Sequence, residues 1–250
     1  MRIGLIIGTG VDFGTSEQWP EVRTPYGPAY AATIPLGGTE VVLLRRHGPG
    51  HNVPPHLINY RANLWALRQA GVERVLATAA VGSMRKEMPP GSLAVVGDFI
   101  DFTKSRDATI FDRPGERVVH IDFSTPYCPE VSAALEQAAA ELGIRLERRL
   151  TYVCVDGPRY ETPAEIRMFA QWGGDVVGMT GVPEVVLARE MGMCYGGLAV
   201  LANYAAGIGD GPLSHEEVIA CVGKRRQDIQ NVLERAVTII PTTRGCCSLP

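Results

Sequence analysis

Residues 194–207 read CYGGLAVLANYAAG, an apolar run that ends in polar and small residues. A run this apolar predicts a strand buried on both faces, as in parallel sheets. Asparagine is depleted in strands. Asn203, where the strand ends, is therefore either a turn residue or an amide that both donates hydrogen bonds to a ligand and accepts them from it.

Similar apolar runs recur along the chain and alternate with helical patterns. Further strands are predicted within residues 1–8, 39–48, 72–82, 92–102, 148–157 and 175–181. Helices are expected over residues 56–70 and 129–142, and from Thr162, Pro183 and Ser214 onward. This alternation predicts an α/β fold in which helices flank a mixed central sheet. No linker-like tract divides the chain, so we expect a single domain over residues 1–250, with a flexible tail at about 242–250.

The amino-acid composition and net charge indicate which binding partners are not expected. Hydrophobic residues make up 46% of the 250 residues, charged residues 20%, and the formal net charge is −3. This balance gives no electrostatic reason to expect nucleic acid or an anionic membrane as partner. The first apolar run is too short for a signal peptide, and no later run reaches the roughly 18 apolar residues of a spanning helix. We therefore expect a cytoplasmic protein.

The six cysteines are scattered and form no C-x-x-C pair. They are Cys128, Cys154, Cys194, Cys221, Cys246 and Cys247. Neither a zinc site nor a disulfide framework is indicated by such spacing, so no metal site is expected. Whether the adjacent Cys246 and Cys247 pair stays open.

Polar motifs follow several of the predicted strands, and ligands of open α/β sheets bind at the carboxyl ends of strands. These motifs are GTG at 8–10, RRHG at 45–48, AAVG at 79–82, DGPRYET at 156–162, GMTG at 178–181 and NYAAG at 203–207. A glycine-rich turn and an arginine can bind an anion, although each motif alone also fits a plain turn or a solvated side chain. Phe13 breaks the G-x-G-x-x-G spacing, which disfavours a nicotinamide-dependent oxidoreductase.

Together and in this order, the segments resemble the trimeric-type purine nucleoside phosphorylases, within the 5′-methylthioadenosine phosphorylase branch. The resemblance is carried by IIGTG (6–10), RRHGPGHNVPPHLINYRANLWAL (45–67), ATAAVGSM (77–84), GPRYETPAE (157–165), GMTGVPEVVLARE (178–190) and SHEEV (214–218). It implies phosphorolysis, in which inorganic phosphate attacks C1′ of a nucleoside and releases the purine. Phosphate is then a co-substrate, and neither a metal nor an organic cofactor is required.

The resemblance also implies roles for individual residues. Phosphate would be held by Thr9, Arg46, His47, the Ala79–Ala80 turn and Thr180, with His51 in support. Ala79 stands where the family often has threonine, so one hydroxyl is missing. Met179 would lie under the sugar and Tyr160 near the base. A homotrimer or a dimer of trimers is implied, with neighbouring residues, including His120, closing each site.

The choice of base depends on hydrogen-bond chemistry. A 6-oxopurine presents N1–H as donor and O6 and N7 as acceptors, so a carboxylate suits N1–H and an amide suits O6 and a protonated N7. Glu161 and Asn203 supply this pair, and a 6-aminopurine would leave Glu161 facing a lone pair. Methylthioadenosine phosphorylases resemble this chain but carry aspartates after that strand and a small residue in place of Glu161. The chain departs from them at Asn203, Ala205 and Glu161.

We therefore expect a 6-oxopurine nucleoside phosphorylase acting on inosine and guanosine, with Asn203, Glu161 and His47 as catalytic residues. His215 opens the last helix, where the family's inosine enzymes place a histidine against the 5′-hydroxyl. Two alternatives stay open: an S-methyl-5′-thioinosine or 5′-methylthioadenosine phosphorylase, and a non-catalytic nucleoside-binding protein. The preference between inosine and guanosine also stays open, as do their deoxy forms and the choice between trimer and hexamer.

Overall fold

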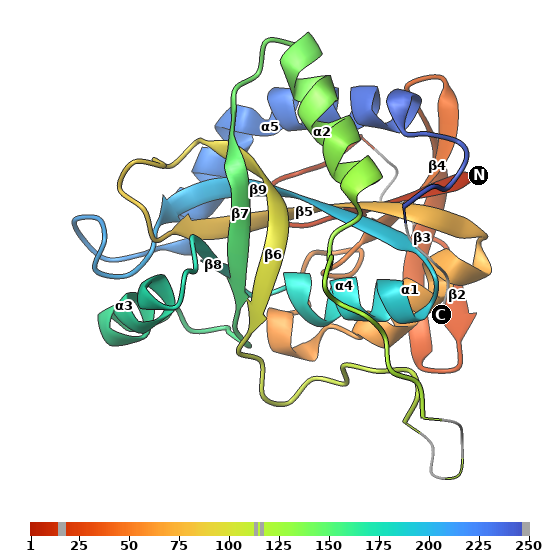
Figure 1. The fold of residues 1–250 in the computed structure, drawn as a ribbon, viewed down its shortest axis with the longest axis horizontal. Helices are drawn as coiled ribbons and strands as arrows, with labels where there is room; N and C mark the ends of the chain where they lie inside the picture. The colour runs from red at the N-terminus through yellow and green to blue at the C-terminus, as the bar shows by residue number, and fades with distance from the viewer. Residues whose placement is uncertain (15–18, 113–114, 116–117, 247–250) are drawn as a thin grey trace.

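A computed structural model describes residues 1–14, 19–112, 115 and 118–246 of the chain (Figure 1). Within these residues the strands are β1 (Arg2–Ile7), β2 (Glu21–Thr24), β3 (Gly27–Leu36), β4 (Thr39–Arg45), β5 (Val72–Ser83), β6 (Leu93–Asp101), β7 (Leu146–Cys154), β8 (Val176–Gly178) and β9 (Cys194–Tyr204). The helices are α1 (Tyr60–Gln69), α2 (Pro129–Glu141), α3 (Pro163–Gln171), α4 (Gly181–Glu190) and α5 (His215–Ile239), with a 3₁₀ turn at Pro55–Leu57. The predicted α/β class and mixed sheet are confirmed.

The strands form a sheet of order β2-β3-β4-β1-β5-β8-β7-β6-β9, and β5 also pairs with β9. The last five strands therefore close into a ring. Because β1, β4, β5 and β9 are mutually parallel, their carboxyl ends meet at one edge. The segments that follow these strands gather at that edge, as the sequence analysis expected for a ligand site.

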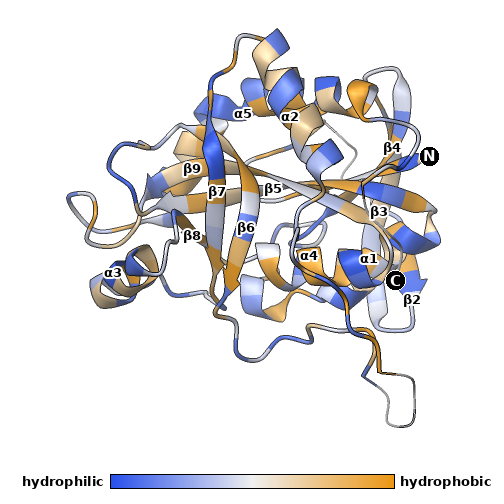
Figure 2. Cartoon of the chain, viewed as in Figure 1, coloured by the Kyte–Doolittle hydropathy of each residue, from blue (hydrophilic) through white to orange (hydrophobic). Residues whose placement is uncertain are grey.

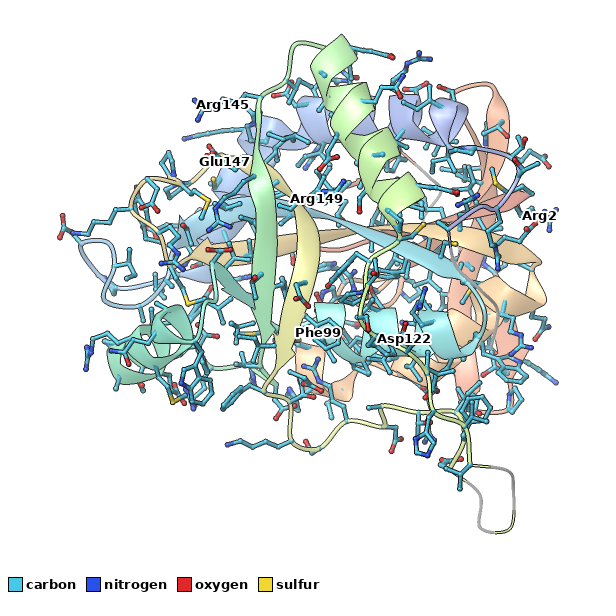
Figure 3. The ribbon with its side chains drawn as sticks, viewed as in Figure 1. Arg2, Phe99, Asp122, Arg145, Glu147 and Arg149 are labelled. Carbon is cyan, nitrogen blue, oxygen red and sulfur yellow. The ribbon has the colours of Figure 1, made fainter. Side chains whose placement is uncertain are left out.

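Two apolar layers cover the sheet. Helices α2 and α5 pack on one face and α1 and α4 on the other (Figure 1). Hydrophilic and hydrophobic residues alternate along α2 (Figure 2), as expected for a helix with one face buried. At the edge of this layer Arg149 of β7 forms an exposed, two-pronged pair with Glu136 of α2, at 2.7 and 2.8 Å (Figure 3).

Local structure differs from the sequence prediction at two places. The helix expected over 56–70 begins only at Tyr60, because Asn59 caps it by accepting the Ala62 N–H at 3.0 Å. The residues before it form the 3₁₀ turn, which starts at a proline that has no N–H to donate. The hairpin of β2 and β3 was not predicted, because its residues lack a continuous apolar run. The capping box of Thr162 and Glu165 is confirmed.

The C-terminal segment bonds to the body of the domain as far as it is described. Arg74 donates to the Thr243 carbonyl, and the Gly245 N–H donates to Glu130, both at 2.9 Å. The rest of the expected tail, 247–250, lies outside the described residues. No helix in the described part of the chain has the length and apolar character needed to cross a membrane.

Candidate active site

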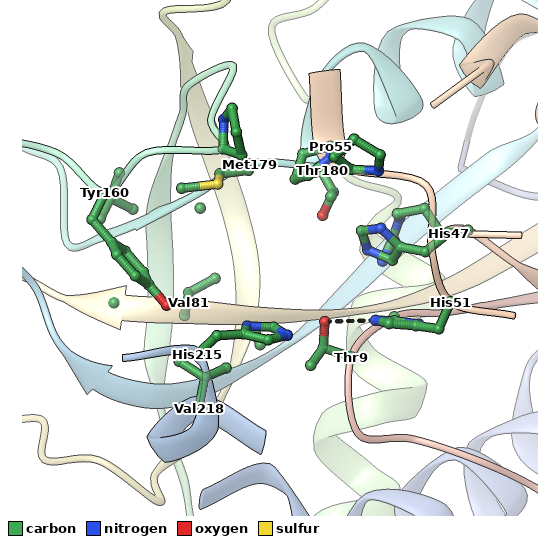
Figure 4. Close-up of a pocket in the computed structure, with 18 of the residues that line it drawn as sticks. Thr9, His47, His51, Pro55, Val81, Tyr160, Met179, Thr180, His215 and Val218 are labelled. Carbon is green, nitrogen blue, oxygen red and sulfur yellow. Dashed lines mark hydrogen bonds between the residues drawn. The ribbon is translucent and has the colours of Figure 1, made fainter. Parts of the chain in front are cut away.

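A cavity of about 420 Å³ opens at the carboxyl edge of the parallel strands (Figure 4). Of the residues singled out in the sequence, it brings together Thr9, Arg46, His47, His51, Ala80, Tyr160, Glu161, Met179, Thr180, Asn203 and His215. These residues come from seven separate segments of the chain, and only the tertiary fold brings them together. Sequence reasoning did not single out several apolar and backbone-lining neighbours, among them Val53, Pro55, Val81 and Val218.

Two expected residues, Ala79 and Ala205, do not line this cavity. Ala79 packs against the apolar layer on the α1 and α4 side of the sheet. Ala205 is 1% exposed and packs in a small apolar core with Ile166 and Phe169. A contact of either alanine with a ligand stays a prediction. His120 is exposed and also lies away from the cavity lining.

Arg46 is held in place by a buried carboxylate. Its Nε and Nη2 donate to the two oxygens of Glu184 at 2.6 and 2.7 Å, and its Nη1 donates to the Thr78 carbonyl at 2.7 Å. The Tyr195 hydroxyl donates to the same carboxylate at 2.6 Å. Burial acts to lower the pKa of Arg46, but Glu184 outweighs it and the pKa stays above its usual range. The guanidinium is therefore charged and rigid.

This arrangement leaves donors for an anion. Each Nη of a guanidinium carries two hydrogens, so Nη1 and Nη2 of Arg46 each retain one N–H beyond their protein partner. Gly8 permits the close approach of the β1 turn, since a Cβ there would lie 2.7 Å from Arg46 Nη1. The sequence analysis placed a helix start at Pro183 and gave no role to Glu184, the residue that follows it. The signal that could have revealed it is a glutamate directly after a proline inside a buried segment.

His47 is a neutral imidazole with a defined tautomer. Its Nδ1 lies 2.9 Å from the Val53 carbonyl, which can only accept, so Nδ1 carries the proton. Burial, followed by the charge of Arg46, lowers the pKa of His47 to about 4. Its Nε2 is then an acceptor at neutral pH. Such a nitrogen complements the P–OH group of hydrogenphosphate.

His51 lies beside it, with the two ring centroids 4.6 Å apart. Its Nε2 lies 3.2 Å from the hydroxyl oxygen of Thr9, the contact drawn in Figure 4. Burial, and then the neighbouring His215, lower the pKa of His51. Its φ of 51° places it in the left-handed region, which few residues other than glycine adopt. Strained backbone of this kind concentrates at functional sites.

Glu161 provides an acceptor at the other end of the cavity. It is 7% exposed, and its Oε1 has no hydrogen-bond partner among the described residues. Burial raises the pKa of this carboxyl group. A buried oxygen without a partner costs about 1–3 kcal/mol, so this geometry favours a ligand that donates to it.

A β-bulge directs Asn203 toward the cavity. Along β5 and β9, Val81 pairs with Leu201 but Gly82 pairs with Asn203, so one extra residue is inserted in β9. Bulges of this kind re-aim side chains beside active sites. The Asn203 Nδ2 donates to the Tyr204 carbonyl at 2.7 Å, which fixes which end of the amide is nitrogen. The oxygen and one N–H remain for a ligand.

Hydrogen bonds hold the backbone at Met179, between the phosphate end and the base end of the cavity. The Met179 carbonyl accepts from Arg106 Nη2 at 2.7 Å and from the Tyr60 hydroxyl at 3.3 Å. Arg106 also donates to the carbonyls of Val155 and Asp156, at 3.2 and 2.9 Å. No motif in the sequence pointed to Arg106. The arginine positions the thioether of Met179, which Figure 4 shows at the cavity.

Two further features complete the cavity. The N–H of Thr180 donates to the Tyr152 hydroxyl at 3.2 Å, while the Thr180 hydroxyl caps no N–H of α4 and is left for a ligand. At the opposite wall, His215 begins α5 and Val218 follows one turn later, so an imidazole and an apolar side chain share this side (Figure 4).

Comparison with known proteins identifies close relatives. A sequence model described as the phosphorylase superfamily matches residues 2–238. A probable 6-oxopurine nucleoside phosphorylase of Moorella thermoacetica is 51% identical, over 100% of this chain and 97% of that protein. A probable S-methyl-5′-thioinosine phosphorylase of Methanopyrus kandleri is 47% identical, over 99% and 96%. A single-residue mutant of the adenosine/methylthioadenosine phosphorylase of Schistosoma mansoni, solved with methylthioadenosine, superposes with a TM-score of 0.90 at 30% identity, over 97% of this chain and 92% of that one.

Proposed function

Because the chain belongs to the phosphorylase superfamily, we propose that it is a 6-oxopurine nucleoside phosphorylase, which cleaves inosine and guanosine with inorganic phosphate. The products are hypoxanthine or guanine and ribose 1-phosphate or its deoxy form. One observation supports the choice of base. Glu161 has a buried carboxylate oxygen with no hydrogen-bond partner among the described residues, and it lines the same cavity as Asn203, whose amide orientation is fixed by the Tyr204 carbonyl.

At the phosphate end, the anion lies among Arg46, His47, Thr9 and Thr180. The two remaining N–H groups of Arg46 donate to phosphate oxygens, and the bare Nε2 of His47 accepts from the P–OH group. Held this way, a phosphate oxygen attacks C1′ of the nucleoside. The C1′–N9 bond breaks, its electron pair passes to the purine, and a C1′–O bond forms. The charge of Glu184 offsets that of Arg46, so the site holds the anion by hydrogen bonds rather than by a net positive charge.

At the base end, the leaving purine gains electron density as the bond to C1′ breaks. As the bond breaks, N7 takes a proton from solvent. The Asn203 oxygen accepts from the N7–H so formed, and the second N–H of the Asn203 amide donates to O6. Glu161 accepts from N1–H. Groups aimed at charge that develops in the transition state are the main source of such rate enhancements. Adenine places a lone pair at N1, which would leave Glu161 without a donor at a cost of about 1–3 kcal/mol or more.

A second candidate is an S-methyl-5′-thioinosine phosphorylase, which would read the base with the same two residues. The observation that favours it is Val218, an apolar side chain beside His215 in the cavity wall. A methylthio group packs on apolar surface, whereas a hydroxyl needs a hydrogen-bond partner such as the imidazole.

The experiment is a substrate panel with phosphate: inosine, guanosine, adenosine and methylthioinosine, with kcat/KM measured for each. We expect inosine or guanosine to exceed adenosine by at least about tenfold to hundredfold. Faster cleavage of adenosine would contradict the base assignment, and a strong preference for methylthioinosine would establish the second candidate. Inosine binding without release of hypoxanthine would instead support a non-catalytic nucleoside-binding protein.

The proposal also covers the oligomeric state of the enzyme and its place in the cell. The enzyme acts in cytoplasmic purine salvage as a homotrimer or a dimer of trimers, in which neighbouring subunits close the sites. The reaction needs neither metal nor organic cofactor, so a chelator leaves the rate of phosphorolysis unchanged. Light scattering of the purified protein distinguishes trimer from hexamer.

A further inference from the structure

Three cysteines that are distant in the sequence converge at the opposite end of β5 from the cavity. The sulfur atoms of Cys128, Cys194 and Cys246 all lie within 4.8 Å of one another. The Sγ of Cys246 is 3.1 Å from that of Cys128 and 3.8 Å from that of Cys194. None of the three lines the cavity described above. Their spacing along the chain gave no sign of this cluster, because each belongs to a different element.

These separations suit joint binding of one ion. Thiolates bound tetrahedrally to zinc at about 2.3 Å lie about 3.8 Å apart. The separation of Cys194 and Cys246 is already 3.8 Å, and the Cys128–Cys246 pair needs to open by less than an ångström. A disulfide would use only two of the three sulfurs. Cys128 and Cys194 are fully buried, while Cys246 is partly exposed.

The cluster lies beside both a guanidinium and a carboxylate. Nη1 of Arg74 lies 4.0 Å from the sulfur of Cys128 and 3.9 Å from that of Cys246, and the same nitrogen pairs with Oε2 of Glu130 at 2.7 Å. Cys128 is the N-cap of α2, a 13-residue helix whose N-terminus attracts anions. A neighbouring arginine and a helix N-terminus both stabilise a thiolate relative to the thiol.

The cluster also joins three separate parts of the chain. Cys128 precedes α2, Cys194 begins β9, and Cys246 lies in the C-terminal segment. That segment already approaches α2 through the hydrogen bond from Gly245 to Glu130. An ion held by all three sulfurs would therefore anchor the end of the chain to the domain.

We propose that Cys128, Cys194 and Cys246 bind a thiophilic d¹⁰ cation of the zinc class, which fastens the C-terminal segment to α2 and β9. On binding, three S–H protons pass to solvent and three metal–sulfur bonds form, with no electron transfer. The site is structural and does not take part in phosphorolysis. Its test is independent of the proposed function.

The test uses the reduced full-length chain carrying Cys247→Ser, so that the neighbouring thiol cannot replace a ligand. Cadmium is titrated and followed by its ultraviolet thiolate charge-transfer band, and zinc is then added as competitor. We expect one ion per chain. Because loss of an outer partner of a ligand already costs about 10- to 100-fold in metal affinity, loss of a ligand should cost at least as much. Cys246→Ser and Cys128→Ser should therefore bind at least that much more weakly.

Matched controls are Cys154→Ser and Cys221→Ser, which remove thiols outside the cluster and should keep full affinity. Zinc should raise the melting temperature of the parent chain but not that of Cys246→Ser, the variant whose altered residue is partly exposed and least prone to misfold. Equal cadmium binding by Cys246→Ser and the parent would overturn the proposal. So would a Cys128–Cys246 disulfide that persists after reduction, seen by peptide mapping, or equal loss of binding in the controls.

Discussion

Replacing Asn203 by aspartate exchanges one amide nitrogen for oxygen where the purine is read. In the native chain this nitrogen donates to the Tyr204 carbonyl at 2.7 Å and has a second N–H for O6 of the base. Aspartate has neither donor. Its oxygen would face the Tyr204 carbonyl at the same short distance, so the substitution removes one ligand contact and adds one repulsive contact.

The effect on the reaction comes from the contact with the base. Loss of the hydrogen bond to O6 costs about 0.5–1.5 kcal/mol, and O6 left without a donor beside a carboxylate costs about 1–3 kcal/mol. Together they amount to about 1.5–4.5 kcal/mol. At 1.36 kcal/mol per factor of ten, kcat/KM for inosine should fall about 10- to 2000-fold. Adenosine should gain some activity, because the new carboxylate accepts from a 6-amino group.

The assay measures phosphorolysis of inosine and adenosine by wild type and by Asn203→Asp, with the KM for phosphate as internal control. Phosphate is bound by other residues, so its KM should change little. If the variant cleaves inosine within about threefold of the wild-type kcat/KM, Asn203 does not contact the base in the transition state. A large rise in the KM for phosphate would show instead that the whole cavity had been disturbed.

Three further substitutions test other parts of the site. Glu184→Gln leaves the buried charge of Arg46 uncompensated and should lower the free energy of unfolding by about 3–5 kcal/mol in urea, whereas the exposed Glu136→Gln should cost less than about 1 kcal/mol. Burial raises the pKa of Glu161, and its protonated form is a weaker acceptor for N1–H because it has lost its negative charge. The kcat/KM for inosine should therefore decline with falling pH, beginning above the usual carboxyl range, and Glu161→Gln should remove that decline; an unchanged profile would assign it to another group. His215→Leu should raise the ratio of kcat/KM for methylthioinosine over inosine at least about tenfold, and a constant ratio would remove His215 from the 5′ pocket.

Much of the site was predictable because its chemistry is carried by short motifs. Thr9, Arg46 and Asn203 lie at the ends of parallel strands, which bring such ends to one edge, whereas Thr180 follows β8, which runs antiparallel to β5. Residue type then predicted what each could bind. Ala205 lies outside the cavity lining because the residues after β9 turn back into a small core, which depends on packing against α3 rather than on local sequence.

Other features depend on contacts between distant segments. The carboxylate that holds Arg46 lies 138 residues away, and the guanidinium that supports Met179 lies 73 residues away. The local sequence identifies neither contact: nothing marks Arg106, and the position of Glu184 after a proline does not reveal its partner, because an ion pair or a carbonyl contact needs only proximity. The convergence of Cys128, Cys194 and Cys246 has the same origin.

By itself, the order of apolar runs and helix caps determined an α/β domain with a ligand site at its strand ends, because burial periodicity and capping are local properties. The tertiary structure alone decided which way each side chain points. The bulge in β9 that directs Asn203 toward the cavity depends on the register with β5, and register is set by packing across the whole sheet.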